Sequence, residues 1–244
     1  MQKFIQKIGE TDSTNLYLRK LLNESDLPNF FCVSTDFQTN GRGQQGTVWE
    51  SNRGENLLFS FLIHSEKIPL NQQFLLSEIV SIGMCNALKY SNLDTKIKWA
   101  NDIFYQDKKL AGILIETIIA GGKMKYAIVG VGLNVNQTEF SENLPNAISL
   151  RQIFGKELDK QTILENILTE ISVLFENFDL KNSDDFQKKY FELLYRNSGY
   201  HLFEEKNDKF YAKILSVAPD GCLKLLTDNN LEKSFYFKEV KFII

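Results

Sequence analysis

The chain has few of the residues that build metal centres and disulfide frameworks. Its 244 residues include three cysteines and two histidines. Cys32, Cys85 and Cys222 are widely spaced and form no CxxC pair, so neither a zinc site nor a disulfide scaffold is indicated. Neither His64 nor His201 has a cysteine or acidic pattern beside it. This scarcity argues against a hydrolase built on a Ser-His-Asp triad.

An excess of basic charge and long apolar runs are also missing. The 28 Lys and Arg residues face 31 Asp and Glu residues, for a formal net charge of −3. Such a balance offers no general attraction to nucleic acid or to an anionic membrane. The apolar runs are too short to span a bilayer, and residues 1–7 lack the apolar core of a signal peptide. With 43% hydrophobic residues, we expect a globular cytoplasmic protein with no nucleic-acid or membrane partner.

A glycine-rich polar loop is the most informative feature that the chain does contain. Residues 41–51 read Gly-Arg-Gly-Gln-Gln-Gly-Thr-Val-Trp-Glu-Ser. Glycines at 41, 43 and 46 let the backbone approach a ligand closely. Successive amides in such a loop form a concavity for an anion, and Arg42 adds a fixed positive charge. No Gly-Lys-Ser/Thr follows, so the loop is not a P-loop. Taken alone, the segment is either only a turn or a site for a phosphate or a phosphate–carboxylate anhydride.

A second cluster of charged residues follows about sixty residues later. Residues 98–102 read Lys-Trp-Ala-Asn-Asp, and residues 108–116 read Lys-Lys-Leu-Ala-Gly-Ile-Leu-Ile-Glu. The pattern predicts a hairpin, which would bring Asp102 and Lys109 near each other across two strands. One interpretation is a surface salt bridge that contributes little to stability. The other is a lysine that is held where an anion binds, with an acid that orients it.

The periodicity of the first two thirds of the chain predicts an α+β fold. Runs of neighbouring strands with helices between others indicate a mixed, largely antiparallel sheet. The nearly continuous apolar run at 57–64 is typical of a strand covered on both faces. The expected strands are 3–9, 30–35, 57–64, 95–99, 103–119 with an internal turn, and 124–133. The expected helices follow caps at 11–14, span 72–90, start near 160, and follow a cap at Ser183.

The last fifty residues read differently from the rest. After Asn-Ser-Gly at 197–199, three turn signals separate short strand-like runs. Composition alone indicates a small all-β unit. We therefore expect two domains, residues 1–195 and residues 196–244.

Five motifs in order resemble the biotin–protein ligase family, also called biotin–[acetyl-CoA-carboxylase] ligases. The matching segments are Ser-Thr-Asn at 13–15, the Gly-Arg-Gly loop at 41–46, Lys-Trp-Ala-Asn-Asp at 98–102, Lys-Leu-Ala-Gly-Ile-Leu-Ile-Glu at 109–116, and Gly-x-Gly-x-Asn at 130–134. The order and spacing fit over residues 8–136. The resemblance implies a catalytic fold like that of class II aminoacyl-tRNA synthetases, followed by a small SH3-like β-barrel. Nothing before residue 8 resembles the DNA-binding domain of bifunctional members, so we expect the monofunctional form.

The resemblance also implies a reaction in two steps. The carboxylate of biotin attacks the α-phosphate of ATP, which gives biotinyl-5′-AMP and pyrophosphate. A lysine of a biotin carboxyl carrier domain, part of a biotin-dependent carboxylase, then takes the biotinyl group and releases AMP. Both steps build negative charge on phosphate oxygens, so positioning and fixed positive charge should provide most of the catalysis. Mg²⁺ is expected mainly through ATP oxygens, with Asn101 as a candidate ligand.

Roles for individual residues follow from the same resemblance. Lys109 matches the lysine between the biotin carboxylate and the α-phosphate, Arg42 contacts the same groups, and Asp102 orients Lys109 or the incoming amine. The implied biotin-binding residues are Ser13, Thr14, Asn15, Gln38, Gly41, Arg42, Lys109, Gly112, Gly130 and Gly132. The implied ATP-binding residues are Arg42, Gly43, Gln44, Trp49, Lys98, Asn101, Lys109 and Asn134.

Several positions allow two interpretations or depart from the family pattern. Residues 13–15 are also a typical helix cap, and Trp49 is either a core aromatic or part of the ligand loop. Gln44 stands where several members carry a second arginine, whose loss is associated with leakier retention of the adenylate. Arg53 is a nearby candidate to compensate. Ala100 replaces the family's proline, which removes a restriction on φ.

Two other functions compete with biotin ligation. A lipoate–protein ligase would adenylate a different acid on a related fold. A non-catalytic module could bind a small molecule or RNA through the terminal barrel, although the acidic balance counts against RNA. The sequence does not distinguish a monomer from a homodimer or identify the acceptor carboxylase.

Overall fold

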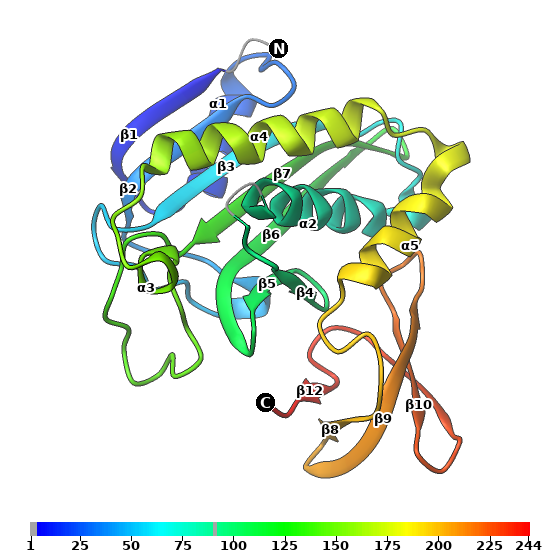
Figure 1. The fold of residues 1–244 in the computed structure, drawn as a ribbon. Helices are drawn as coiled ribbons and strands as arrows, with labels where there is room; N and C mark the ends of the chain where they lie inside the picture. Colours follow the sequence, from blue (N-terminus) through cyan, green and yellow to red (C-terminus); the bar gives the residue numbers. More distant parts are fainter. Residues whose placement is uncertain (1–3, 90–91) are drawn as a thin grey trace.

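The computed structural model of the chain, which describes residues 4–89 and 92–244, contains one large mixed sheet (Figure 1). The strand order is β1-β2-β3-β7-β6-β5-β4. Strands β1 and β2 pair in parallel, and the other neighbours are antiparallel. The expected mixed, largely antiparallel sheet is therefore confirmed. The strands are β1 (Ile5–Thr11), β2 (Cys32–Gln38), β3 (Leu57–His64), β4 (Lys96–Lys98), β5 (Asp102–Tyr105), β6 (Lys108–Ala120) and β7 (Lys123–Leu133).

Helices cover both faces of this sheet. On one face, Leu18 of α1 packs with Val33, Leu62 and Ile128. On the other face, α2 and α4 pack over a larger core that includes Phe61. Neighbouring residues of β3 thus enter opposite cores, which explains the continuous apolar run of this strand. The helices are α1 (Thr14–Glu24), α2 (Phe74–Lys89), α3 (Leu150–Phe154), α4 (Lys160–Glu176) and α5 (Ser183–Leu193), and the 3-10 helices are η1 (Gln44–Gly46), η2 (Leu70–Gln72) and η3 (Leu180–Asn182).

Two tight hairpins set the register of the central strands. Gln106 adopts a positive φ between β5 and β6, and Gly121 and Gly122 do so between β6 and β7. Positive φ costs glycine little, so these two glycines suit the second hairpin.

Several expected boundaries were wrong by one or two residues, among them the end of β1, which is Thr11 rather than residue 9, and the start of α2, which is Phe74 rather than residue 72. Strand β2 begins at Cys32 rather than residue 30, and the cap of α5 is Asn182 rather than Ser183.

The C-terminal part forms a separate five-stranded antiparallel sheet. Its order is β11-β10-β9-β8-β12. In the described ranges, no strand pairing joins β11 to β12, so the sheet is open and the SH3-like barrel is not confirmed. The strands are β8 (His201–Glu205), β9 (Asp208–Val217), β10 (Leu223–Thr227), β11 (Glu232–Phe235) and β12 (Lys241–Phe242).

The two sheets meet at the segment that precedes β5. The Trp99 indole Nε1 donates a hydrogen bond of 3.0 Å to the Gly221 carbonyl. Its ring also packs against Phe237, with 6.3 Å between ring centroids. The Arg196 guanidinium donates to the Ile243 carbonyl at 2.8 Å. These contacts fix the C-terminal sheet beside residues 98–102. Across the residues that the structure describes, no helix has both the length and the apolar character that a membrane crossing needs.

Candidate active site

A cavity with a glycine floor lies on the α1 face of the large sheet. Gly130 and Gly132 point the same way as Ile128 on β7 because alternate residues of a strand share a face. Gly112 of β6 is the neighbour of Gly132, and Ser60 of β3 is the neighbour of Gly130. Because glycine has no side chain, the surface of the sheet lies deeper here, and the side chains above it, such as Asn15 over Gly130 and Trp49 over Gly132, leave a space between them. The result is a cavity of about 330 Å³.

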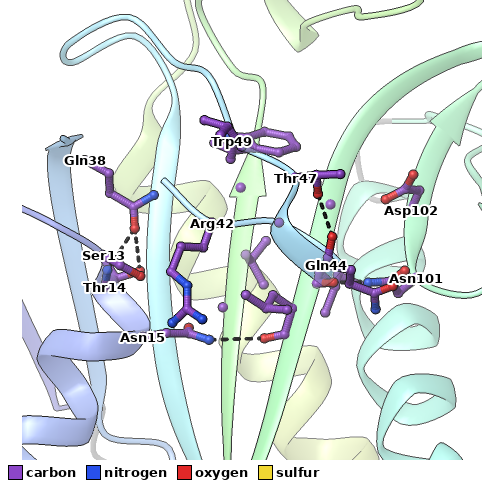
Figure 2. A pocket seen from close by; sticks show the side chains of 18 of the residues that line it. Ser13, Thr14, Asn15, Gln38, Arg42, Gln44, Thr47, Trp49, Asn101 and Asp102 are labelled. Atoms are coloured by element: carbon purple, nitrogen blue, oxygen red, sulfur yellow. Dashed lines mark hydrogen bonds between the residues drawn. The ribbon is translucent and has the colours of Figure 1, made fainter. Parts of the chain in front are cut away.

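Most of the predicted site residues line this one cavity (Figure 2). Residues from seven separate segments of the chain meet here. The predicted residues that line it are Ser13, Thr14, Asn15, Gln38, Arg42, Gly43, Gln44, Trp49, Asn101, Asp102, Lys109, Gly112, Gly130 and Gly132. The lining residues that sequence reasoning missed are Thr47, Val48, Ile113, Leu114, Val131, Leu144 and Phe237.

One end of the cavity is a connected polar network at the start of α1. The Gln38 Oε1 atom accepts hydrogen bonds from the Thr14 backbone amide at 2.8 Å and the Thr14 hydroxyl at 3.0 Å. The Ser60 hydroxyl lies 2.7 Å from the Thr14 hydroxyl and 2.6 Å from Asn15 Oδ1. The Asn15 amide donates to Glu116 Oε2 at 2.9 Å. These bonds hold the donors and acceptors of this wall in place.

Ser13 is the N-cap residue of α1 by backbone geometry, but its side chain makes no capping hydrogen bond. Asp12 Oδ1 instead accepts from the Ser13 amide at 2.7 Å, and this hydrogen bond lowers the pKa of the Asp12 carboxyl. The Ser13 side chain is buried and faces the cavity. The geometry therefore favours a ligand contact over the capping interpretation.

The Arg42 side chain extends from the glycine loop toward Asn15 (Figure 2). Its guanidinium lies 3.6 Å from Glu116 Oε1, and Arg19 approaches the other oxygen of Glu116 at 4.0 Å. Glu116 ends the Lys-Leu-Ala-Gly motif but was not predicted as a site residue. Its carboxylate balances the charge of Arg42.

The opposite end of the cavity holds an ion pair. Lys109 Nζ lies 2.8 Å from Asp102 Oδ1, as the hairpin predicted. The Lys109 backbone is anchored by a 2.6 Å hydrogen bond from its amide to the Asn146 carbonyl. Both side chains are partly exposed, so the pair adds at most about 1 kcal/mol to stability. An anionic ligand can therefore replace Asp102 at small cost.

The Trp49 side chain covers the glycine floor. A methyl group on Gly132 would overlap its indole ring, and one on Gly112 would lie 3.0 Å from it. Lys109 Nζ is 5.6 Å from the ring centroid. The Trp49 Nε1 and Gln44 Oε1 atoms are buried without a hydrogen-bond partner in the described part of the chain. Buried polar atoms are normally paired, so these two favour the ligand-loop interpretation of Trp49.

The segment before Asp102 is held from both sides. The Asn101 side-chain amide donates to the Ile113 carbonyl, and the Ile113 amide donates to the Asn101 carbonyl at 3.1 Å. The Tyr190 hydroxyl donates to the Ala100 carbonyl at 2.8 Å. The peptide bond between Trp99 and Ala100 is cis. The acid of the ion pair thus stands on a firmly anchored turn.

Three predicted site residues do not line the cavity. Lys98 Nζ lies over the rings of Phe104 and Phe242, at 5.1 and 5.6 Å, and burial lowers the pKa of this amine. The Asn134 side chain donates to the Ile148 carbonyl at 3.1 Å and so anchors the loop that follows β7. Gly41 lies behind Trp49, whose amide donates to its carbonyl at 3.0 Å, and it borders an adjoining hollow.

Arg53 is also away from the cavity. Its guanidinium pairs with Glu10 and lies 4.5 Å from the centre of the Phe37 ring. The structure therefore gives no support to the idea that Arg53 compensates for Gln44. In the ranges that the structure covers, no group of three or more His, Cys, Asp or Glu residues is arranged to hold a metal ion.

The fold and cavity together have the architecture of enzymes that join a small acid to a protein. The chain belongs to the Biotin/lipoate A/B protein ligase family, whose model matches residues 8–134. It is 27% identical to the bifunctional ligase/repressor BirA of Bacillus subtilis over 242 residues, which cover 91% of this chain and 69% of that protein. It is 34% identical to biotin–protein ligase 2 of Arabidopsis thaliana over 229 residues, which cover 86% of this chain and 66% of that protein.

A solved structure resembles the whole chain. The biotin protein ligase from Aquifex aeolicus in complex with biotin and ATP superposes with a TM-score of 0.80 at 27% identity. The match covers 99% of this chain and 100% of the other. The resemblance therefore extends beyond the family motifs into the C-terminal sheet.

Proposed function

We propose that this chain is a biotin–protein ligase, which activates biotin as biotinyl-5′-AMP and transfers it to a lysine of a biotin carboxyl carrier domain. The observation that carries the proposal is one cavity in which the glycine floor, the polar start of α1 and the Lys109–Asp102 pair meet. The likeness to a ligase solved with biotin and ATP supports it over almost the entire chain.

The cavity suits biotin at the α1 end. Ser13, Thr14 and Gln38 offer donors and acceptors for the ureido ring. The Trp49 ring packs directly on Gly132 and close to Gly112, so the acyl chain would run along the sheet beside this ring rather than beneath it. In this placement the carboxyl group points toward the Lys109 end.

Lys109 then stands where the first reaction occurs. A carboxylate oxygen of biotin forms a bond to the α-phosphorus of ATP, and the bond to the pyrophosphate oxygen breaks. The Lys109 ammonium stabilises the negative charge that moves across these oxygens. Asp102 holds the ammonium at 2.8 Å before the ligands take over that contact.

The second reaction needs no protein nucleophile. The amine of the carrier lysine attacks the carbonyl carbon of the mixed anhydride, and AMP leaves. Asp102 lines the cavity and, once Lys109 turns to the ligand, is free to accept a hydrogen bond from the incoming amine. We assign it this second positioning role.

We place the phosphates in the middle of the cavity, between Lys109 and the loop that carries Arg42, Gly43 and Gln44, and the nucleoside beyond them near Asn101. Mg²⁺ would be held mainly by ATP oxygens, because this ion keeps several waters and takes few protein ligands. The oxygen atoms of Asn101 and Asp102 at this end fit such an ion, which would neutralise phosphate charge. We leave Lys98 and Asn134 out of this arrangement, because neither of them lines the cavity.

We also propose a division into a catalytic domain, residues 1–195, and a C-terminal β domain, residues 196–244. The separate pairing of the two sheets supports this boundary. An SH3-like relation of the second domain remains part of the proposal.

Mass spectrometry of a carboxyl carrier domain tests the function directly. After incubation with the protein, ATP, Mg²⁺ and biotin, we expect the carrier to gain one biotinyl mass. Lipoate replaces biotin in a parallel reaction, because the family contains ligases for both acids. Labelling by lipoate alone would reassign the substrate, and no added mass with either acid would contradict a ligase.

A further inference from the structure

The C-terminal sheet contributes a side chain to the cavity. Phe237 lies in the connection between β11 and β12, and its ring is half-buried. Of the lining residues that the structure describes, it is the one that comes from beyond residue 195. Nothing in the sequence motifs pointed to this residue.

The connection that carries Phe237 is fixed on both sides. The Phe237 ring packs against Trp99 with 6.3 Å between centroids and 56° between planes. The neighbouring Tyr236 hydroxyl donates to Asp220 Oδ2 at 2.8 Å. The Tyr236 amide donates to Glu239 Oε2 at 2.6 Å, and the Glu239 amide donates back to the Tyr236 carbonyl at 3.0 Å. The ring is therefore presented to the cavity rather than left on a loose loop.

Phe237 marks the end of the cavity away from α1. Its partner Trp99 immediately precedes the segment that carries Asn101 and Asp102. Figure 2 shows these two residues across the cavity from Ser13. With the acid at the α1 end and Lys109 at the reacting carboxylate, this far end remains for the nucleoside.

The chemistry of this end suits a flat aromatic group. Leu144 and Phe237 add apolar surface beside the polar Asn101 and Asp102. A phenyl ring offers a face on which a purine base can stack, and such contacts are sequence-tolerant and substantial. Polar neighbours would meet the ribose and phosphates.

We propose that Phe237 contacts the base of ATP and of the acyl-adenylate, so that the C-terminal sheet supplies part of the nucleotide site. The proposal rests on the proposed ligase function for the order of groups along the cavity. It predicts that a bound nucleotide contacts both sheets, at the place where residues 98–102 lie between them. A ring that only packs on Trp99 would instead affect stability without distinguishing ATP from biotin.

Steady-state kinetics of biotin-dependent ATP–pyrophosphate exchange separate the two roles. For Phe237→Ala we expect the KM for ATP to rise by about tenfold, the loss typical of one base–aromatic contact. The KM for biotin should stay within about twofold, because the acid binds at the other end. Phe237→Tyr keeps the ring and should restore the KM for ATP. Tyr211→Ala, which removes an exposed aromatic from the same sheet, is the matched control.

Direct binding measurements keep this inference separate from the ligase function. Calorimetry of ATP with the unchanged protein and with Phe237→Ala should show the same tenfold difference, whichever acid is activated. Equal losses for ATP and biotin, or an unchanged affinity for ATP, would overturn the contact. Absence of exchange in the unchanged protein, with ATP still bound through Phe237, would count against the ligase and not against the contact.

Discussion

At the scale of single residues, the cavity pairs each of its two predicted catalytic cations with a carboxylate. Lys109 is paired with Asp102, and Arg42, which extends from the loop over the cavity, is paired with Glu116. Partly exposed pairs of this kind are weak. A ligand that carries a carboxylate and phosphates can therefore exchange with the protein carboxylates, and each cation is already positioned when it arrives.

Lys109→Ala should impair adenylate formation far more than ATP binding. The ammonium acts on charge that develops in the transition state, so we expect single-turnover adenylation to slow by about 10²–10³-fold. The affinity for ATP should change only a few-fold. Lys108→Ala, at the exposed neighbouring position, should leave both quantities near their original values. Equal losses in rate and affinity would reduce Lys109 to a binding contact.

Glu116→Gln should strengthen binding of ATP. The substituted side chain can still accept the hydrogen bond from Asn15, but it no longer competes with the phosphates for Arg42. An exposed pair is worth about 0.2–1 kcal/mol, so the dissociation constant should fall by about two- to fivefold. Calorimetry measures this change, with the exposed Glu142→Gln as control. Weaker binding would instead mean that Glu116 holds Arg42 in its productive orientation.

Gln44→Arg should slow the release of biotinyl-5′-AMP. Gln44 offers a neutral hydrogen bond, about 0.5–1.5 kcal/mol, where an arginine would offer about 1.5–3 kcal/mol. The expected reduction in dissociation rate is about five- to tenfold. Arg53→Ala should leave the rate unchanged, because that guanidinium is occupied by Glu10 and Phe37. A faster release from Arg53→Ala would restore Arg53 as the compensating residue.

At the scale of secondary-structure elements, the glycines of β6 and β7, which have no side chain, shape the floor of the cavity. Gly132→Ala should weaken biotin binding by about tenfold or more, because the added methyl group overlaps the Trp49 ring and raises the floor. Gly9→Ala on β1 is the matched control, since a methyl group there has no neighbour within 4 Å. Calorimetric titration with biotin compares the two variants. Unchanged affinity in Gly132→Ala would mean that biotin does not lie along this strand.

Elements with a strong local pattern could be predicted from the sequence. The apolar run of β3 and the nearly all-apolar helix α2 both required burial on several sides. The hairpin between β5 and β6 followed from its turn residues and brought Lys109 to Asp102. The ends of the elements followed less directly from the sequence. Phe30 adopts a positive φ, so the extended conformation of β2 begins only after it, at Cys32. A phenylalanine gives no sign of this conformation, because residues other than glycine rarely adopt it.

At the scale of the whole molecule, the missed parts of the site are contacts between distant segments. Glu116 meets Arg42, and Phe237 meets Trp99, across more than seventy residues of sequence. Lys98 was assigned to the nucleotide by its motif, yet the C-terminal sheet places Phe242 over its amine. Local sequence patterns carry no information about such long-range contacts, because these contacts depend on how the folded segments are placed relative to one another.

The core beneath residues 98–102 contains a carboxyl group that makes stability depend on pH. Glu78 of α2 is 1% exposed, and its Oε2 atom has no hydrogen-bond partner in the described ranges. Burial raises the pKa of Glu78 to about 8. It lies near Tyr190, whose hydroxyl holds the Ala100 carbonyl. The folded protein therefore prefers the protonated form of Glu78.

The sign of the pH effect follows from this preference. Between the ordinary pKa of about 4.5 and the raised pKa of about 8, the folded state binds more protons at Glu78 than the unfolded state. The free energy of unfolding must then fall as pH rises through this window. Glu78→Gln, which is neutral at every pH, removes this contribution.

We expect Glu78→Gln to be more stable than the unchanged protein at pH 8 by about 1–3 kcal/mol, because the folded protein must bind a proton at Glu78 or bury its charge, whereas the amide is neutral. The difference should shrink toward pH 5, where Glu78 is protonated in the folded state. Urea unfolding at several pH values measures it, and Glu24→Gln, at an exposed position of helix α1, is the control. A difference that does not change between pH 5 and pH 8 would show that Glu78 keeps one charge state throughout. In that case Glu78 would make no pH-dependent contribution to the free energy of unfolding.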